Sequence, residues 1–192
     1  MKTLLKLFAA GLLSVGLANA TPHSIDKGHS DVGFSVKHLM ITNVKGKFSD
    51  YDAKIDFDYK NKTFNALEAT IKATSINTGI EKRDNHLRSD DFFAADKFPE
   101  ITFKMKSYKA DGDEGVMTGD LTMRGVTKEV KLEVDDIATV KDFKGNNRVG
   151  FTLEGEVNRM DYGLKWNKAL EFGGVAVSEN VKLIIEVSAV EK

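Results

Sequence analysis

Few residues of this sequence have the type and spacing that catalysis needs. The four histidines are dispersed along the chain: His23, His29, His38 and His86. None makes a metal-spaced pair with a neighbour, although the last three could meet in space as a weak zinc or copper site. The chain has no cysteine, no G-x-S-x-G motif, no H-E-x-x-H motif and no P-loop. We therefore expect a protein that is not an enzyme and that holds no cofactor and no metal.

Arginine is the residue type that best fits recognition of a polar ligand group, because a guanidinium presents a fork of hydrogen-bond donors. We assign Arg83 and Arg88 as the candidates that would meet an acidic or neutral head group. Arg124 and Arg159 are further candidates. Each of the four is more often an ordinary surface or ion-pair arginine, so they do not establish a ligand site by themselves.

A short helix is expected around the first of these arginines. Thr78-Gly79-Ile80-Glu81 has the form of a capping box, in which the threonine oxygen accepts the amide three residues on and the glutamate reaches back. Ile80 and Leu87 share one helical face and are predicted to be buried. Asp84 and Arg88 stand four residues apart and are predicted to pair on the surface.

Two adjacent phenylalanines follow this helix. Phe92 and Phe93 are too apolar for an ordinary exposed loop, and Phe98-Pro99 then precedes a new strand. A helix that carries aromatic residues between two halves of a sheet protein is typical of a lid or a plug. It could equally do no more than close the end of a barrel, with its charges in solvent.

The first twenty residues have the pattern of a cleavable signal peptide. Lys2 and Lys6 supply a basic start, residues 7–17 form an apolar run, and Ala18-Asn19-Ala20 is a cleavage site. We therefore divide the chain into a signal peptide, 1–20, and a single domain, 21–192. An exported protein without cysteine fits a bacterial periplasm, because its fold must hold without disulfide bonds.

The charge balance points away from nucleic acid and from a membrane-embedded barrel. Without Lys2 and Lys6, 26 basic residues remain against 29 acidic ones, and no basic cluster stands out. An outer-membrane barrel would need an outward apolar band, whereas alternate strand positions here carry Lys, Asp and Glu. The sequence therefore predicts a soluble protein.

Apolar and polar residues alternate along most of the chain, with turn residues between the alternating segments. This period-two pattern with polar outer faces predicts antiparallel strands in a sandwich or a barrel. Closing the sheet would remove the exposed edges. The eight strands are predicted at residues 32–38, 44–57, 67–73, 101–105, 117–123, 130–134, 149–157 and 181–187, after a polar lead-in at 24–31.

Several inward positions of these strands carry small residues among Phe, Met, Leu and Ile. Small residues in the wall of a barrel leave space that a long apolar ligand could fill. They could equally fit the taper of the barrel or let the helix pack closely. The small inward residues are Ala53, Ala69, Ala73, Gly119 and Gly155.

The strand pattern breaks between Gly163 and Asn180. This long apolar loop contains the lone tryptophan, Trp166, and the pair Gly173-Gly174. Long loops in compact domains are usually functional or packed against another part of the fold. We interpret it as a second wall of a cavity mouth, opposite the helix, with simple packing over the barrel end as the alternative.

Four blocks of the sequence resemble those of the YceI-like family, in the same order along the chain. They are DKGHSDVGFSVKH at residues 26–38, RDNHLRSDDFF with FPEITF at 83–93 and 98–103, GDLTMRGVT at 119–127, and NRMDYGL at 158–164. Together they span nearly the whole of the predicted mature chain.

The resemblance implies an extended, lipocalin-like, eight-stranded antiparallel β-barrel with a short helix closing one end. It also implies a periplasmic protein, commonly a homodimer. The tunnel of such a protein would hold a long-chain isoprenoid, such as a polyprenyl chain or an isoprenoid quinone, or a fatty-acyl amphiphile.

Individual ligand contacts follow from inward parity and nearness to the predicted lid, since the family has no fixed motif for them. A slip of one residue in the register of a strand would turn its candidates outward. The candidate ligand-binding residues are Phe34, Val36, Phe92, Phe93, Phe103, Met105, Leu121, Met123 and Trp166.

Two functions therefore stand side by side. The first is a periplasmic carrier or store for a long-chain isoprenoid or acyl amphiphile. The second is a non-enzymatic interaction module that docks to a membrane redox or stress-response partner. The second predicts a packed interior and an exposed apolar patch around Trp166 and Phe172.

Overall fold

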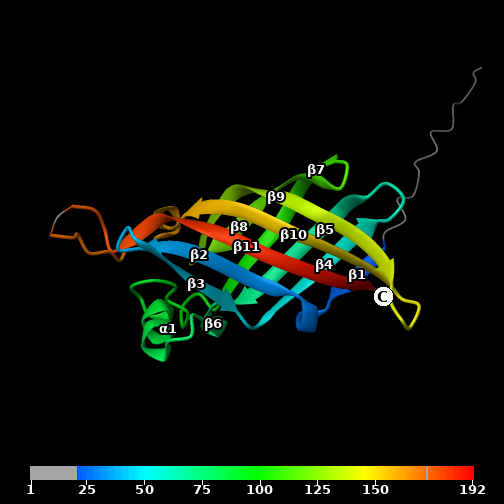
Figure 1. Cartoon of the computed structure of the whole chain (residues 1–192). Coiled ribbons are helices and arrows are strands. Elements are labelled where there is room, and N and C mark those ends of the chain that lie inside the picture. The colour runs from blue at the N-terminus through cyan, green and yellow to red at the C-terminus, as the bar shows by residue number, and fades with distance from the viewer. Residues whose placement is uncertain (1–20, 172) are drawn as a thin grey trace, which may run out of the picture.

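The computed structural model describes residues 21–171 and 173–192, and Figure 1 shows their arrangement. They form an elongated barrel of antiparallel strands, and the short helix α1 (Glu81–Arg88) lies beside one end of it. The predicted signal peptide, residues 1–20, lies outside the described residues.

Eleven strands of the described chain form one sheet. Eight of them make a closed ring in the order β1-β4-β5-β7-β8-β9-β10-β11, because β1 pairs with both β4 and β11. This ring confirms the predicted eight-stranded antiparallel barrel. The strands are β1 (Pro22–Ile25), β2 (Asp31–His38), β3 (Thr42–Phe48), β4 (Tyr51–Asp58), β5 (Thr63–Lys72), β6 (Ile76–Asn77), β7 (Glu100–Asp111), β8 (Glu114–Met123), β9 (Val126–Lys141), β10 (Asn147–Asn158) and β11 (Val177–Glu191).

The predicted strand 44–57 is in fact two strands, β3 and β4, so this prediction was wrong. The chain turns a corner at Ser49 and Asp50. The Ser49 amide donates to the carbonyl of Ser75 at 3.2 Å, and the Asp50 carbonyl accepts from the amide of Lys72 at 2.9 Å. As a result β3 pairs with β2 and β6, while β4 pairs with β1 and β5.

The predicted polar lead-in, 24–31, also contains regular structure. β1 and β2 both pair with β11, and a single 3₁₀ turn (Lys27–His29) bulges out between them. Asp26 caps this turn by accepting a hydrogen bond from the Gly28 amide. The same carboxylate binds His29 and Arg148 of β10, which ties the turn to the barrel wall.

Burial alternates along the strands as period two requires. On β8 the inward positions Met117, Gly119, Leu121 and Met123 are buried, whereas the residues between them are partly exposed. The inner faces of the ring therefore form one core, and the charged outer faces meet solvent.

The segment from 78 to 99 links β6 to β7 and contains α1, which lies against β6 (Figure 1). Aromatic rings hold this segment to the barrel. The Phe93 ring meets the Phe48 ring of β3 at 5.7 Å, and Phe48 meets the Phe34 ring of β2 at 5.9 Å. Such edge and tilted contacts add to the area that the rings bury.

The start of α1 differs from the predicted capping box. Ile80 is the residue before the first turn, it offers no side-chain cap, and it is 53% exposed instead of buried. The amide and hydroxyl of Thr78 instead donate to the carboxylate of Asp84, which is buried. Leu87, also predicted to be buried, is half-buried and packs against the core.

The predicted surface pair of Asp84 and Arg88 does not form. Asp84 is committed to Thr78. The guanidinium of Arg88 donates to the carbonyls of Thr74 and Ile76 at 2.7 and 2.9 Å, which fixes the end of α1 to the chain before it.

Candidate ligand-binding cavity

An apolar cavity of about 190 Å³ lies inside the ring of strands. Inward residues from all eight strands of the ring line it, together with residues of β2, β3, α1 and two loops. A cavity enclosed by so many separate segments depends on the closed barrel and cannot be read from one motif.

Seven of the nine predicted ligand-binding residues line this cavity. They come from β2, from the loop after α1, and from β7 and β8, which are far apart in the sequence. These residues are Phe34, Val36, Phe92, Phe93, Phe103, Leu121 and Met123.

The other two predicted residues, Met105 and Trp166, do not line the cavity. Met105 has the inward parity of β7 and pairs with Gly119 of β8. The Phe103 ring covers Gly119 and so lies between this pair and the cavity. Trp166 packs on Phe92 from the outer side, with the two ring centroids 5.4 Å apart.

The small inward residues fall into three sets. Ala53 and Ala69 face each other across β4 and β5 and line the cavity. At Gly119 and Gly155 the space is already occupied, because an added Cβ would lie 2.5 Å from the Phe103 ring and 2.6 Å from the Leu132 side chain. Ala73 is buried without lining the cavity. The alanine pair therefore opens the cavity, and the glycines serve packing.

The charged and hydroxyl-bearing residues of the wall turn their polar groups away from the cavity. The Tyr51 hydroxyl donates to the carbonyl of Ser30 at 2.6 Å, and Asp52 is exposed on the outside of the barrel. The cavity surface is therefore hydrocarbon, which suits an apolar chain and offers no partner to a polar group.

Arg159 is the buried charged residue of the wall, only 3% exposed. Its guanidinium donates to the backbone carbonyls of Ser178 at 2.8 Å, Trp166 at 3.0 Å and Val177 at 3.2 Å, and also to that of Leu164. Burial lowers the pKa of Arg159, an effect that the nearby Glu179 opposes. Arg159 thus holds both ends of the 163–177 loop and brings only its aliphatic stem to the cavity.

The two arginines assigned to a ligand head group lie elsewhere. Arg83 donates to the hydroxyl and the carbonyl of Thr78 at 2.7 and 2.8 Å, and Arg88 donates to carbonyls beside β6. Neither lines the cavity. Both fasten α1, and their assignment as head-group residues stays a prediction.

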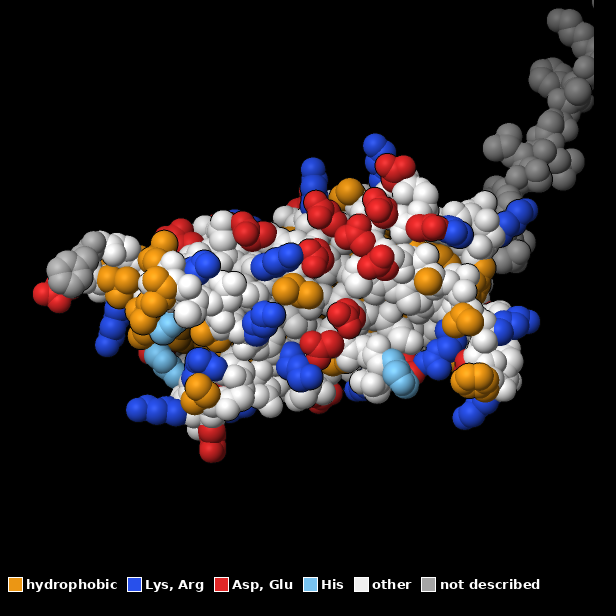
Figure 2. Space-filling view, viewed as in Figure 1, with side chains coloured by type: hydrophobic (Ala, Val, Ile, Leu, Met, Phe, Trp, Pro, Cys, Tyr) orange, Lys and Arg blue, Asp and Glu red, His pale blue; other side chains and the backbone are white. Residues whose placement is uncertain are grey.

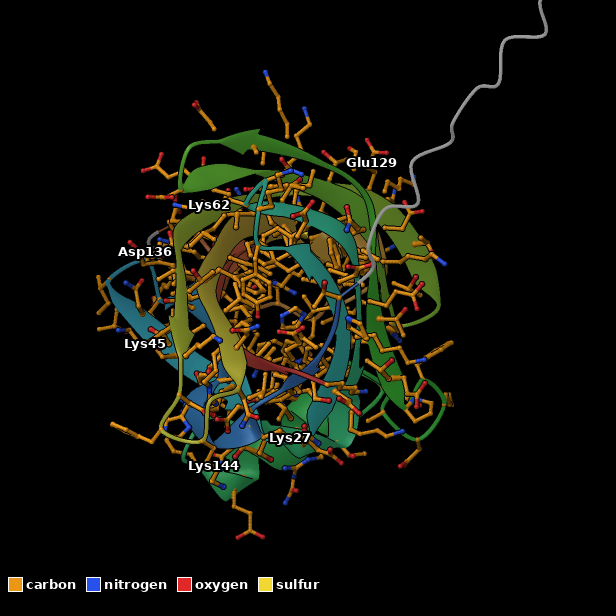
Figure 3. The ribbon with its side chains drawn as sticks, turned by 90° about the vertical axis from the view of Figure 1, so that its right-hand side faces the viewer. Lys27, Lys45, Lys62, Glu129, Asp136 and Lys144 are labelled. Atoms are coloured by element: carbon orange, nitrogen blue, oxygen red, sulfur yellow. The ribbon has the colours of Figure 1, made fainter. Side chains whose placement is uncertain are left out.

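An aromatic plug closes the end of the barrel away from α1. The ring centroid of Phe64 lies 5.0 Å from that of Phe57 and 4.7 Å from that of Phe151. All three side chains are buried. Tyr108 and Tyr59 pack against them at 5.1 and 5.4 Å. Figure 3, which views this end, shows side chains projecting into the ring, with the labelled charged residues around its outside.

His23 completes the plug. Its Nε2 lies 2.6 Å from the hydroxyl of Tyr59, and its Nδ1 is buried without a partner. Burial, with a smaller contribution from Glu191, raises the pKa of Tyr59 to about 12, so this phenol stays neutral. In the part of the chain that the structure describes, none of the plug residues lines the cavity, and their buried rings lie beyond it at this end.

At the other end a cluster of three rings covers the cavity. His86 of α1 lies 5.0 Å from the ring of Trp166 and 5.1 Å from that of Phe92. His86 also binds the carboxylate of Asp91 at 2.7 Å. This ring cluster joins α1, the loop after it and the 163–177 loop, so it has the placement expected of a lid over the cavity mouth.

The loop from 163 to 177 forms part of the same mouth. Leu164 and Val177, at its two ends, line the cavity. The predicted second wall therefore consists of the two ends of the loop, while Trp166 packs outside on the ring cluster. Phe172, part of the predicted exposed patch, lies outside the described residues.

The sequence analysis missed a number of lining residues. Those on strands follow the same inward parity and could have been selected by it, whereas Leu87, Arg159 and Leu164 carry no local signal of where they would lie. The missed strand residues include Ile55, Leu67, Leu132, Val181, Leu183 and Ile185.

The dispersed histidines do not come together. His29 pairs with Asp26, His86 with Asp91, and His23 with Tyr59. Within residues 21–171 and 173–192, no group of three or more His, Cys, Asp or Glu side chains is placed to hold a metal ion. The same part of the chain has no helix that is both long and apolar enough to cross a membrane.

Comparison with known proteins gives one consistent family. The model of the YceI-like domain matches residues 23–189. The protein YceI of Shigella flexneri is 40% identical over 194 aligned positions, which cover 100% of this chain and 98% of that protein.

Solved structures agree with this match. A Campylobacter jejuni YCEI protein is 45% identical, with a TM-score of 0.73 over 87% of this chain and 96% of that chain. A polyisoprenoid binding domain from Saccharophagus degradans has a TM-score of 0.62 over 91% of this chain and 100% of that chain. At 15% identity, the second likeness shows the fold alone.

Proposed function

Because this chain belongs to the YceI-like family, we propose that it is a periplasmic carrier or store for an amphiphile with a long apolar tail. The tail, an isoprenoid or a fatty-acyl chain, lies in the barrel cavity. The protein acts by binding and release, and it carries out no reaction on the ligand.

The hydrocarbon cavity is the observation that carries this proposal. An empty cavity of 190 Å³ costs about 4 to 5 kcal/mol at roughly 24 cal/mol per Å³. Each methylene group of a ligand contributes about 0.8 kcal/mol when it is buried, so about six of them offset that cost. An apolar chain therefore stabilises this fold, and water does not, because the wall gives water no hydrogen-bond partner.

The geometry also supports one orientation of the ligand. The aromatic plug closes one end, and the guanidinium of Arg159 is occupied by four backbone carbonyls. The tail therefore enters first and the polar head stays at the mouth, beside the ring cluster. The polyisoprenoid binding domain of Saccharophagus degradans, which shares the fold, supports an isoprenoid as the first tail to test.

Native mass spectrometry of protein purified gently from its own cells tests the proposal, followed by solvent extraction and identification of any released lipid. A stoichiometric isoprenoid or acyl amphiphile is the expected result. A lipid-free mass, together with no binding of added polyprenol or isoprenoid quinone, would overturn it.

The interaction-module alternative gains less support. It predicts a packed interior, whereas the barrel contains a cavity. It also predicts an exposed patch around Trp166, whereas Trp166 is half-buried against His86 and Phe92.

Export and assembly belong to the same proposal. The basic, apolar and Ala-Asn-Ala pattern of residues 1–20 supports a cleaved signal peptide and a periplasmic location. The homodimer remains a prediction from the family resemblance. Cell fractionation tests the location, and light scattering of the mature protein tests the dimer.

A further inference from the structure

The turn between β2 and β3 exposes three consecutive large apolar residues. We call it the β2–β3 tip: Leu39 is 40% exposed, Met40 54% and Ile41 76%. Single exposed apolar residues are ordinary, but a contiguous apolar group on a turn marks a surface that meets an apolar partner.

The backbone of the tip makes this choice of residues more unusual. Leu39 and Met40 have φ angles of 50° and 61°, a region in which Gly, Asn and Asp are favoured and bulky residues are strained. A stable turn here would use Asn-Gly, so the large side chains are not explained by the turn itself.

The tip is held firmly in place. The Leu39 amide donates to the carbonyl of Ala176 at 2.9 Å, and the Met40 side chain packs on Gly174. The tip and the 163–177 loop therefore contact each other at one end of the molecule.

Basic residues surround the tip. No Asp or Glu lies between Asp31 and Asp50, although the whole chain has a formal net charge of −1. Lys37 and Lys45 flank the tip on β2 and β3, and both are exposed. Within the residues that the structure describes, neither has an ion-pair partner.

The neighbouring loop adds two further cations. Lys165 and Lys168 are exposed, and in the described part of the chain neither pairs with a carboxylate. Glu171 is the acidic residue of this loop. Figure 2 shows hydrophobic side chains gathered at this end of the molecule, with basic side chains around them.

This end of the molecule also contains the cavity mouth. Val36 lies three residues before the tip, and Val177 pairs with His38 at the base of the tip. Both valines line the cavity. The apolar tip and the route into the cavity therefore face the same way.

We propose that the β2–β3 tip docks the barrel on a bilayer surface that contains anionic lipids. Leu39, Met40 and Ile41 enter the interface between head groups and acyl chains, and the four lysines bind lipid phosphates. Apolar insertion combined with basic flanks is the pattern of proteins that lie on such surfaces. Docking places the mouth where a lipid tail can pass between bilayer and cavity; only this last step rests on the proposed function.

Flotation of lipid-free mature protein with vesicles tests the docking. Vesicles of phosphatidylcholine are compared with vesicles that also contain phosphatidylglycerol, at low and high salt. We expect the protein to bind the anionic vesicles and to be released by salt, because exposed charges are screened. Equal binding to both kinds of vesicle, or no binding to either, overturns the proposal.

The main variant combines Leu39→Asn, Met40→Gly and Ile41→Ser. Asn and Gly suit the positive φ angles, so the melting temperature should not fall. We expect the partition coefficient on anionic vesicles to drop by at least about tenfold. Unchanged binding overturns the proposal.

Val140→Ser with Phe143→Ser is the matched control. These residues are 64% and 112% exposed and lie at the opposite end of the barrel. Their replacement should leave vesicle binding unchanged, and an equal loss would overturn the assignment to the tip.

A second variant, Lys37→Gln with Lys45→Gln, changes only exposed side chains and so preserves the fold. It should weaken anionic binding and reduce its salt dependence. Ligand binding is followed separately by native mass spectrometry. Ligand binding without docking overturns this inference alone, and docking without any ligand overturns the proposed function alone.

Discussion

Ala53 and Ala69 show how two small side chains can leave a cavity inside a barrel. They face each other across β4 and β5, where larger side chains would fill the interior. Elsewhere in the same barrel, glycines bring rings and side chains into close contact instead. The size of a wall residue therefore has meaning only together with the residue opposite.

Ala69→Leu should fill part of the cavity. We expect ligand affinity to fall by about tenfold, because the new side chain displaces about two methylene groups of the tail. The free energy of unfolding of the lipid-free protein should rise by about 1 kcal/mol. Denaturant unfolding and ligand titration measure the two effects.

Ala66→Leu is the control for this change. Ala66 lies on the same strand at an exposed position, so the same increase in volume should affect neither quantity by a comparable amount. Equal loss of affinity in both variants would contradict the role given to Ala69.

Asp26 gives a prediction about acid stability. The hydrogen bond to His29 lowers the pKa of Asp26 below its usual 3.8, burial opposes this, and Arg148 and the Gly28 amide add to the lowering. The ionised side chain therefore stabilises the folded state. That contribution is complete above about pH 4 and is lost as the pH falls through the lower, folded-state pKa.

Asp26→Asn should accordingly lower the free energy of unfolding at neutral pH and leave it unchanged in strong acid. Urea unfolding of both proteins across the acid range measures the difference. A difference that stays constant with pH would show that Asp26 contributes through the shape of the turn alone.

At the scale of elements, the lid depends on the contact between Phe92 and Trp166. Phe92→Ala should open the ring cluster, speed ligand dissociation by about tenfold or more, and shift the emission of the lone tryptophan towards that of an exposed indole. The cost in stability should be about 3 kcal/mol or more for a buried ring of this size.

Stopped-flow release of a fluorescent lipid measures the dissociation rate. Phe143→Ala, which removes an exposed ring at the far end, is the control. If the rate were the same in all three proteins, the cluster would be packing and not a lid.

Period two in the sequence predicted antiparallel strands in a sandwich or a barrel, because each strand places every second residue in one core, and the family resemblance favoured the closed barrel. The prediction of one strand over 44–57 overlooked the corner at Ser49 and Asp50, where the inward parity changes from even positions up to Phe48 to odd positions from Tyr51. The hydrogen bonds that make the corner come from Lys72, at the end of β5, and from Ser75, in the 3₁₀ turn that follows it.

The capping box failed for a related reason. Thr78 and Glu81 have the right types and spacing for a capping box. The amide and hydroxyl of Thr78 instead donate to the carboxylate of Asp84, which is buried beside Thr78. For the site, parity selected Phe34, Phe103 and Leu121, which line the cavity. It could not place Trp166 or Arg159, whose positions depend on how a loop folds over the barrel end.

For the whole molecule, the empty cavity links stability to cargo. Removing the lipid should lower the melting temperature, and adding it back at about one hundred times its dissociation constant should restore about 2.7 kcal/mol. In a domain of this size that corresponds to about 5 to 10 °C. Calorimetry before and after solvent extraction measures the shift, and an unchanged melting temperature would contradict a stable complex.

In the proposed carrier, the aromatic plug would set the kinetics of lipid exchange. A tube open at both ends could push out one lipid as the next one entered, and its exchange rate would rise with the concentration of the newcomer. With Phe57, Phe64 and Phe151 blocking one end, the barrel must empty before it refills. Turnover of cargo is then a first-order process, governed by the residence time of the lipid already inside, however much lipid waits outside.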